Sequence, residues 1–433
     1  MKLRYLICIN LFLICSCIKE VEPVLPSSGD ITQMDGDGVT WKYDQNRWTY
    51  SQMKSMYFWT EDIPDSTSLD FSADSFVFFE SLLSDKDRFS YLSANPGYDN
   101  KVALYEGLDY YSYVDSSGDL VYRVIRVTDP LLRTQWKRGD WFVLRDGHPV
   151  RGYITGQGEF KEDSDSARPS KYYICDFTDT LYRVGDKSVG YVIYEDFDLY
   201  ADFARILHSL REKGEMDELI LDLRYNPGGY VEVCRKICSL IVPPQYLGQL
   251  FQIQEHNDIQ NRKAAQAQGG GNGLDSLYFS DDVRTKQLNF DLDRVYVLTT
   301  RHTASASESL IHCLRPYMEV ITVGSVSRGK NVGGRTISDE RYRYSLHPIT
   351  FQYMDAEGKL FSSDGMEPDI YAEDDLNHEL GDMDESMLAT ALRHISGDSC
   401  GNKAHRSERS GIRYPVEYGN YVNRMPGNME NHR

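Results

Sequence analysis

The chain of 433 residues lacks two features that would place it in a bilayer or on a nucleic acid. Beyond its first 16 residues it has no run of about 18 apolar residues, the minimum for a membrane-spanning helix. It also lacks excess positive charge, since 47 Lys and Arg stand against 66 Asp and Glu, for a net charge of −19. A surface this acidic repels phosphate backbones and anionic lipid head groups. Nucleic acid is therefore not an expected partner.

The composition is that of an ordinary globular protein. With 41% hydrophobic and 26% charged residues, collagen-like, coiled-coil and largely disordered chains are excluded. The length predicts about two or three domains. The 31 Tyr and 17 Phe supply large apolar areas with polar tips, which suits an extended groove or several packed subdomains.

The first 16 residues are typical of a signal peptide. Lys2 and Arg4 precede a mostly apolar run over 5–14, which is too short to span a membrane. The following Ile14-Cys15-Ser16-Cys17 resembles the lipobox of bacterial lipoproteins, which implies cleavage before Cys17 and lipid on that residue. The expected location is the cell envelope, at the outer membrane, its periplasmic face or the cell surface. A secretory signal cleaved without lipidation is the alternative.

Cysteine is scarce in the rest of the chain. After removal of the signal and lipidation of Cys17, five scattered cysteines remain, an odd number that forms no disulfide framework. Cys234 and Cys238 lie on one predicted helix, but no further soft ligands lie near them. We therefore expect buried small apolar side chains there rather than a zinc site. No metal and no cofactor are implied.

Changes in residue pattern divide the chain into regions. Residues 17–39 and 397–433 are aperiodic, and we expect a flexible tether and a poorly ordered tail. An aromatic-rich stretch leading into a helical pattern that starts near Asp74 predicts a small N-terminal helical domain over 40–98. Short alternating strands over 107–114, 120–127 and 141–145 predict a β domain over 99–182. Over 183–396 strands alternate with helices, which predicts a layered α/β core with a mostly parallel sheet.

The predicted β domain carries a signature of its own. Trp136-Lys137-Arg138-Gly139-Asp140-Trp141, followed by a strand and Asp146-Gly147, resembles the glycine-aspartate motif of PDZ domains in bacterial proteases. A PDZ domain binds a peptide C-terminus as an added strand and holds its carboxylate with backbone N–H groups. The resemblance implies a carboxylate-binding loop at Gly107-Leu108-Asp109-Tyr110. Another small β-barrel with a tight turn is the alternative.

Two short segments of the α/β core begin where a predicted strand ends. The first is Asp222-Leu223-Arg224-Tyr225-Asn226-Pro227-Gly228-Gly229. Its glycines allow a tight turn and leave N–H groups at the start of the next helix, an arrangement that receives an anion or oxyanion. An ordinary strand-to-helix turn needs similar residues, so this segment alone does not establish a site.

The second segment is Thr303-Ala304-Ser305-Ala306-Ser307-Glu308, between a strand at 295–299 and a helix at 306–314. Small residues around its hydroxyls would let another backbone approach closely. Ser305 and Glu308 also fit a helix capping box, in which the serine hydroxyl only accepts a backbone N–H. From this segment alone, capping is favoured over catalysis.

Lys330 is the candidate base for a serine nucleophile. A serine hydroxyl needs a base near neutral pH, and a lysine serves only if burial lowers its pKa far below about 10.4. Lys330 lies in Arg328-Gly329-Lys330-Asn331-Val332-Gly333-Gly334, after an apolar strand at 320–323, where burial is feasible. A surface lysine in a glycine-rich loop is the alternative.

Together these segments resemble the ordered motifs of the tail-specific or carboxyl-terminal processing serine peptidases. Lys330 lies 25 positions after Ser305, which is that family's spacing, and Asp364-Gly365-Met366-Glu367-Pro368-Asp369-Ile370 is similar to its closing motif. Asp85-Lys86-Asp87-Arg88-Phe89-Ser90-Tyr91 looks like the lipoprotein members of Bacteroides-like bacteria. The resemblance runs from about residue 40 to 395 and implies a ClpP/crotonase-like core with an inserted PDZ-like domain.

The resemblance also implies roles for single residues. Ser305 would be the nucleophile and Lys330 its general base. The N–H of Ala306, with one from Gly228 or Gly229, would form the oxyanion hole. The implied activity is endopeptidase cleavage of polypeptides through an acyl-enzyme, after the PDZ domain has captured an unstructured C-terminal segment.

One position departs from the family pattern. Many members carry a glutamine four residues after the lysine, thought to orient it, and this chain has Gly334. A catalytically weak or inactive peptide-binding lipoprotein on the same scaffold is therefore the main alternative. A second alternative uses His302 as the base, although its side chain would need a sharp turn to reach the hydroxyl. Neither the natural substrate nor the oligomeric state follows from the sequence.

Overall fold

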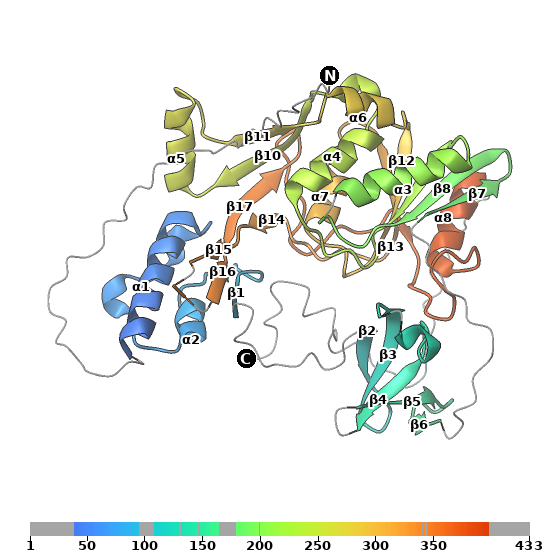
Figure 1. Cartoon of the computed structure of the whole chain (residues 1–433), viewed down its shortest axis with the longest axis horizontal. Coiled ribbons are helices and arrows are strands. Elements are labelled where there is room, and N and C mark those ends of the chain that lie inside the picture. The colour runs from blue at the N-terminus through green and yellow to red at the C-terminus, as the bar shows by residue number, and fades with distance from the viewer. Residues whose placement is uncertain are drawn as a thin grey trace, which may run out of the picture.

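The computed structural model of the chain describes residues 39–94, 108–129, 131–145, 148–163, 179–198, 200–339, 341–342 and 344–397. The predicted signal peptide, Cys17, Gly107 and the turn at Asp146-Gly147 lie outside these residues, as do nearly all of the predicted tether and tail. The described residues form four sheets with helices packed around them (Figure 1). This is the mixed α/β, multidomain fold expected from the sequence.

A six-stranded sheet forms the centre of the α/β core. In spatial order its strands are β18 (Ile370–Tyr371), β13 (Glu319–Gly324), β12 (Arg294–Thr299), β9 (Glu218–Asp222), β8 (Lys187–Ile193) and β7 (Asp179–Val184). Every pairing is parallel except that of β7 with β8. All residues of β9 are buried, as expected for an almost continuous apolar run inside a parallel sheet. The mostly parallel sheet predicted from the sequence is confirmed.

Helices cover both faces of this sheet (Figure 1). One face carries α3 (Tyr200–Lys213), α4 (Val231–Ile241) and α7 (Ala306–Leu314), with α6 (Val283–Leu288) beside α4, and the other carries α8 (Ser386–Ser396). Apolar residues of α3 spaced three and four apart face the sheet. Cys234 and Cys238 are fully buried on α4, with their Sγ atoms 3.9 Å apart. They pack as small core side chains, as expected.

A second sheet forms an arm that extends from the core. Its antiparallel strands are, in order, β11 (Asp275–Tyr278), β10 (Leu250–His256), β17 (Ile349–Met354) and β14 (Val332–Gly334), and α5 (Asp258–Ala267) links β10 to β11. Before Pro348, the chain of β17 forms β16 (Tyr344–His347), which pairs with β1 (Tyr91–Ala94) and β15 (Ile337–Ser338). Figure 1 shows this arm running from the core to the first helices of the chain.

The N-terminal part packs on that arm. It consists of α1 (Val39–Met56), α2 (Ser75–Glu80) and the 3-10 helices Thr60–Asp62 and Ser66–Ser68. The helix α2 begins where the sequence predicts, because the Asp74 carboxylate accepts the N–H of Phe76. Apolar residues of both helices share a core with Leu346 of β16. The N-terminal part therefore lies against strands from much later in the chain.

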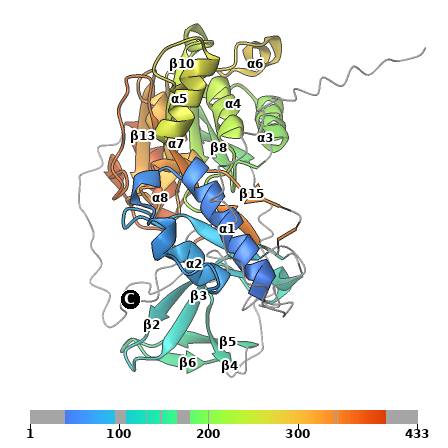
Figure 2. The ribbon, with the colours of Figure 1, turned by 90° about the vertical axis from the view of Figure 1, so that its left-hand side faces the viewer.

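Five antiparallel strands form a separate sheet at the lower end of the molecule (Figure 2). In order they are β2 (Leu108–Val114), β3 (Leu120–Val127), β4 (Trp141–Arg145), β5 (His148–Ile154) and β6 (Phe160–Glu162), with a 3-10 helix at Leu132–Thr134. The bounds of β3 and β4 coincide with the predicted strands. Within the described residues β2 pairs with β3 alone, so it is an edge strand.

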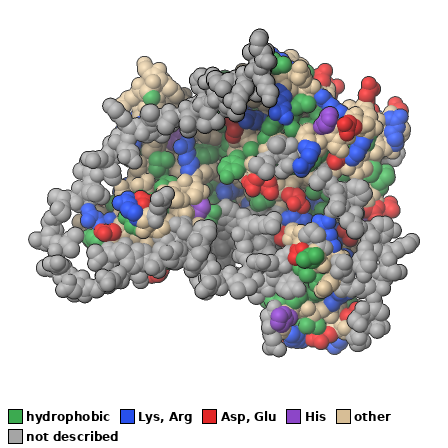
Figure 3. Space-filling model, in the orientation of Figure 1, with side chains coloured by type: hydrophobic (Ala, Val, Ile, Leu, Met, Phe, Trp, Pro, Cys, Tyr) green, Lys and Arg blue, Asp and Glu red, His purple; other side chains and the backbone are tan. Residues whose placement is uncertain are grey.

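Charges of both signs are mixed on the face of the core seen in Figure 3. Arg235 pairs with Glu232 over 2.6 Å, and Arg294 pairs with Glu218 over 2.5 Å. On the face seen in Figure 3, basic and acidic side chains are interspersed, and neither kind forms one broad patch. No helix among the described residues is both long and apolar enough to cross a bilayer.

Candidate active site

The two predicted loops meet at the carboxyl ends of neighbouring strands. Because β9 and β12 pair in parallel, the loops that follow them leave the sheet at the same edge. Thr303 Oγ1 donates to the carbonyl of Leu223 over 2.8 Å, and the N–H of Ala304 donates to the carbonyl of Asn226 over 3.1 Å. The hydroxyl of Ser307 donates to the same Asn226 carbonyl over 3.0 Å. These bonds hold the two loops against each other.

Ser305 precedes the first turn of α7 in a strained backbone conformation. Its φ is +56°, a left-handed value that few residues other than glycine adopt. A Cβ on Gly228 would lie 2.8 Å from the Cβ of Ser305 and 2.9 Å from the nitrogen of Ala306, so only glycine fits there. The first glycine of the predicted anion-binding turn therefore lies directly against the half-buried Ser305.

Backbone N–H groups near Ser305 are candidate donors to an oxyanion. Within the described part of the chain, the N–H groups of Ala306 and Gly229 have no acceptor. Gly228 instead donates to Oδ1 of Asn226 over 2.8 Å. The two residues on either side of Gly229 make backbone hydrogen bonds to Phe197. The N–H of Gly229 itself therefore points away from Phe197. Of the two glycines expected as donors, Gly229 is therefore the available one.

Lys330 lies in the loop after β13, half-buried beside the N-terminal part. Its Nζ is 5.4 Å from the ring centre of Phe89. No carboxylate of a described residue lies within ion-pair distance of this amine. Burial lowers the pKa of Lys330 to about 8, although the nearby Glu308 and Asp87 act to raise it. An amine with this pKa is neutral in about a tenth of the molecules at pH 7.

Glu308 connects the backbones of Ser305 and Lys330. Its Oε2 accepts the N–H of Ser305 over 2.9 Å and the N–H of Lys330 over 2.8 Å. Its Oε1 accepts the N–H of Gly329 and the hydroxyl of Ser327, each over 2.6 Å. Burial raises the pKa of Glu308, and these hydrogen bonds act to lower it. Glu308 thus caps α7 at Ser305, as its position in the motif suggests, and also fixes the loop of Lys330.

Tyr353, which no sequence motif marks, makes a second connection. Its hydroxyl lies 3.1 Å from the carbonyl oxygen of Ser305 and 3.1 Å from that of Lys330. The side chain is almost fully buried on β17. The alternating pattern of 349–354 indicates a strand, but no local signal relates this tyrosine to Lys330. Only the packing of the arm on the core brings the two together.

The predicted closing motif packs on the loop of Lys330. The N–H of Met366 donates to the hydroxyl of Ser327 over 2.8 Å, and the N–H of Ser327 returns a bond to the Met366 carbonyl over 3.1 Å. A Cβ on Gly329 would lie 2.1 Å from the carbonyl oxygen of Ser363. Loop and motif therefore pack backbone against backbone.

The structure gives a steric reason for the glycine at 334. Gly334 ends β14, at a point where its pairing with β17 is irregular. A Cβ there would lie 2.4 Å from the carbonyl oxygen of Pro348. A glutamine at this position therefore has no room unless the two strands shift.

Models of known protein families match two stretches of the chain. The profile described as "Peptidase family S41" matches residues 188–372, and "Peptidase S41 N-terminal domain" matches residues 44–91. The two matches together cover just over half of the chain. The chain belongs to peptidase family S41. This confirms the family that the motifs predicted, a family of serine-type peptidases.

Individual S41 relatives match parts of the chain. It is 28% identical to the carboxy-terminal processing protease CtpB of Bacillus subtilis over 193 residues, which are 43% of this chain and 35% of that protein. It is 32% identical to a carboxyl-terminal-processing protease of Synechocystis over 149 residues, 34% of this chain and 29% of that protein. The match thus spans about a third of the length of these relatives. A Bacteroides fragilis protein assigned to the S41 proteases has a similar fold, with a TM-score of 0.63 at 22% identity over 86% of this chain and 100% of the other.

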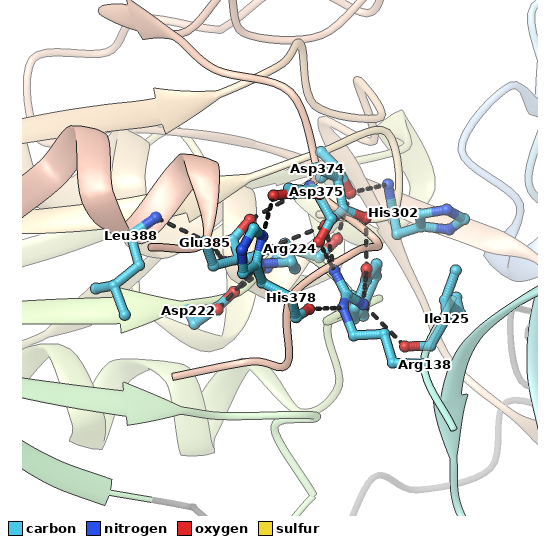
Figure 4. A network of polar contacts seen from close by, with 12 residues as sticks. Ile125, Arg138, Asp222, Arg224, His302, Asp374, Asp375, His378, Glu385 and Leu388 are labelled. Atoms are coloured by element: carbon cyan, nitrogen blue, oxygen red, sulfur yellow. Dashed lines mark hydrogen bonds and ion pairs between the residues drawn. The ribbon is translucent and has the colours of Figure 1, made fainter. Parts of the chain in front are cut away.

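A second buried polar cluster lies beside the candidate S41 site (Figure 4). Arg224, from the loop after β9, contacts Asp222 over 2.9 Å, Asp374 over 3.0 Å and Glu385 over 2.9 Å. Arg138, from the loop before β4, contacts Asp374 over 2.6 Å. These five residues form the arginine network. Because Asp374 follows β18, the network joins the five-stranded sheet to the core.

The arginine network keeps its charges. Burial alone would lower the pKa of Arg224, but its carboxylate partners raise it well above its ordinary value. Burial alone would raise the pKa of Asp374, but Arg138 and Arg224 hold it far below its usual range. The Arg224 guanidinium and the Asp374 carboxylate therefore stay ionised near neutral pH.

His302, the alternative base, lies against tyrosines of two regions. Its ring stacks on Tyr111 of β2, with ring centres 5.2 Å apart, and meets Tyr225 edge-on at 6.0 Å. Burial lowers the pKa of His302 to about 3. An imidazole with so low a pKa is a weak base near neutral pH. The packing of this S41 chain thus favours Lys330 over His302 for the role of base.

The residues expected to receive a peptide terminus lie at the start of the edge strand β2. Leu108 and Tyr110 pack into the core of the five-stranded sheet. Between them, the buried Asp109 pairs with Arg126 over 2.6 Å, and Arg126 also pairs with Glu195 of the core. The side chains at this position are therefore engaged in packing and in ion pairs.

Proposed function

We propose that this S41 member is a serine endopeptidase in which Ser305 is the nucleophile and Lys330 the general base. The observation that carries the proposal is their shared acceptor, Glu308 Oε2, because it keeps the two backbones within two hydrogen bonds of each other. The low pKa of Lys330 supports it further, since a neutral amine is present near neutral pH. Gly228 packs directly against Ser305, which places the glycine turn next to the proposed nucleophile.

In the proposed reaction the neutral amine of Lys330 removes the proton from the Ser305 hydroxyl while Oγ attacks the carbonyl carbon of the peptide. Negative charge that develops on the carbonyl oxygen is stabilised by the N–H groups of Ala306 and Gly229. The lysine ammonium then gives its proton to the departing amine, which leaves an ester on Ser305. Water then attacks the ester while Lys330 takes its proton, the bond to Ser305 Oγ breaks, and Lys330 returns the proton to Oγ as the new carboxyl end is released.

We propose polypeptides as substrates, captured through an unstructured C-terminal segment by the five-stranded sheet acting as a PDZ domain. The position of β2 at the edge of its sheet supports this, because an extended peptide adds to an edge strand through main-chain hydrogen bonds. The start of β2 at Leu108 would then lie near the peptide carboxylate. Lipid on Cys17 would hold the enzyme at the cell envelope, where its substrates would be envelope or secreted polypeptides.

Covalent labelling with a fluorophosphonate tests the dyad. We expect the full-length protein to be labelled at Ser305, as read by peptide mapping, and expect labelling to disappear in Ser305→Ala and in Lys330→Ala. The matched control is Ser309→Ala, which removes a buried hydroxyl one turn further along α7 that accepts a bond from Gln252 over 2.6 Å. This control should be labelled as the unmodified protein is.

Other outcomes point to the alternatives. Labelling that survives Lys330→Ala but is lost in His302→Phe would make His302 the base. A folded protein that binds C-terminal peptides in calorimetry but never labels and never cleaves them would be a peptide-binding lipoprotein instead of an enzyme.

A further inference from the structure

A general base must lie within hydrogen-bond reach of its hydroxyl, about 2.6–3.2 Å, so Lys330 has to be held in place. The position four residues later offers no side chain for this, because a Cβ at Gly334 would collide with Pro348. The charged or titratable residues that face Lys330 come from α7, the N-terminal part, its own loop and β16, and they are Glu308, Asp87, Arg328 and His347. None of these carboxylates forms an ion pair with the amine. The position of Lys330 must therefore be fixed mainly through its backbone.

Glu308 can fix that backbone only as an ionised carboxylate. Each of its two oxygens accepts two hydrogen bonds, and all four partners are N–H or O–H donors. A proton on either oxygen, or the NH2 group of an amide, would face donors instead of acceptors. The four donors therefore favour a negatively charged group at this point. A neutral side chain of the same shape would lose two of the four hydrogen bonds.

Tyr353 contacts the same two residues through groups of the opposite kind. Its hydroxyl lies at hydrogen-bond distance from the carbonyl oxygens of Ser305 and Lys330, whereas Glu308 accepts their N–H groups. The loop of Lys330 also runs along β17, because the N–H of Tyr353 donates to the carbonyl of Asn331 over 3.4 Å. Ser305 and Lys330 are thus bridged twice, once from α7 and once from β17.

We propose that Glu308 and Tyr353 are positioning residues that together hold Ser305 and Lys330 in register, in place of a side chain at 334. The inference rests on the proposed roles of Ser305 and Lys330. Glu308 and Tyr353 act through the backbones of the dyad and not on the substrate. Their loss should therefore lower kcat and leave KM nearly unchanged.

The substitution Tyr353→Phe tests one bridge by removing the hydroxyl alone. We expect kcat for peptide hydrolysis to fall by about ten- to hundredfold, because small displacements of a base are costly, with KM changed by less than about twofold. The matched control is Tyr317→Phe, which removes a hydroxyl bonded to the carbonyl of Leu250, away from the site. It should keep kcat. Wild-type kcat in Tyr353→Phe, or a change in KM alone, overturns the role of Tyr353.

The substitution Glu308→Gln tests the other bridge with a second readout, the pH dependence of kcat/KM. We expect kcat to fall by about a hundredfold. The midpoint of the profile should move to lower pH, because the Glu308 carboxylate raises the pKa of Lys330 and the amide does not. The control is Glu218→Gln, which changes a buried carboxylate paired with Lys187 and Arg294 at the far end of β9. A midpoint in Glu308→Gln that matches this control overturns the role of Glu308.

These results can be separated from failure of the proposed function. An unmodified protein that is neither labelled at Ser305 nor able to cleave peptides refutes the function itself. An active unmodified protein with fully active Tyr353→Phe refutes the positioning role alone. If Glu308→Gln does not fold, the milder Tyr353→Phe decides the proposal by itself.

Discussion

Two clusters of polar side chains, one around Arg224 after β9 and one around Lys330 after β13, differ in whether their charges are paired. In the arginine network, each guanidinium faces carboxylates at distances of 2.6 to 3.0 Å. Around Lys330, the carboxylate of Glu308 is engaged by backbone N–H groups and the amine faces the ring of Phe89. The first cluster pairs its charges, and the second leaves one amine without a partner among the described residues.

The difference shows that burial alone does not decide the charge of a side chain in this molecule. Arg224 is fully buried, yet its partners raise its pKa. Among the described residues Lys330 has no such partner, and burial lowers its pKa to about 8. The paired cluster therefore carries fixed charges that hold parts of the fold together. The unpaired amine can lose its proton near neutral pH, which is the property that a base requires.

The largest effect on activity is expected from Lys330→Met. Loss of the general base should reduce kcat roughly a thousandfold. The melting temperature should stay equal or rise, because a buried amine is replaced by an apolar chain of similar length. Hydrolysis of an unstructured peptide and thermal unfolding measure the two effects. Lys263→Met, at an exposed site on α5, is the control and should change neither. Near-normal turnover in Lys330→Met would mean that the unpaired amine does not act as the base.

The largest effect on stability is expected from Arg224→Met. The change leaves three buried carboxylates without their shared partner, which should lower the free energy of unfolding by about 3–5 kcal/mol. Urea denaturation measures this. The same substitution at Arg145, whose ion pair with Glu162 is exposed, should cost at most about 1 kcal/mol. Equal losses in the two variants would mean that the arginine network holds the fold no better than a surface pair does.

The pH profile sharpens the comparison. Because the neutral form of Lys330 is the active one and its pKa is about 8, kcat/KM should rise about tenfold from pH 7 to pH 9. The arginine network should not titrate in this interval, since the pKa of Asp374 is lowered and that of Arg224 is raised. Initial rates at low substrate concentration provide the profile. A rate that falls over this interval would assign the reaction to a different group.

The smallest effect is expected from substitution of Phe89, whose ring lies beside the Lys330 amine. Phe89→Ala should admit water to Lys330, raise its pKa and so move the midpoint to higher pH, with a loss of about threefold in kcat/KM at pH 7. Phe89→Leu keeps an apolar side chain beside the amine. The midpoint of its pH profile should equal that of the unmodified protein. A midpoint that moves to lower pH in Phe89→Ala would mean that the ring does not act by excluding water.

Local patterns were enough to predict the elements of the core. Helix α7 and strands β3 and β4 follow the predicted bounds, because short runs of apolar residues and turn signals determine where such elements begin and end. The meeting of the loops that carry Gly228 and Ser305 also follows from sequence, since loops after adjacent parallel strands share one edge of the sheet.

Contacts between distant segments could not be predicted in this way. The partners of Arg224 at 374 and 385 lie about 150 residues further along the chain. No local sequence pattern indicates that these residues are in contact. Tyr353 belongs to an arm whose strands were not foreseen, so its contact with Lys330 stayed hidden. Glu308 was recognised as a cap, but its second role depends on a loop that arrives from another strand.

The collision at position 334 limits how this protein can change. A mutation that introduces glutamine at this position would push β14 away from Pro348. The backbone at Pro348 therefore requires a glycine at 334. A larger residue at 334 requires a shift of the backbone where β16 meets β17.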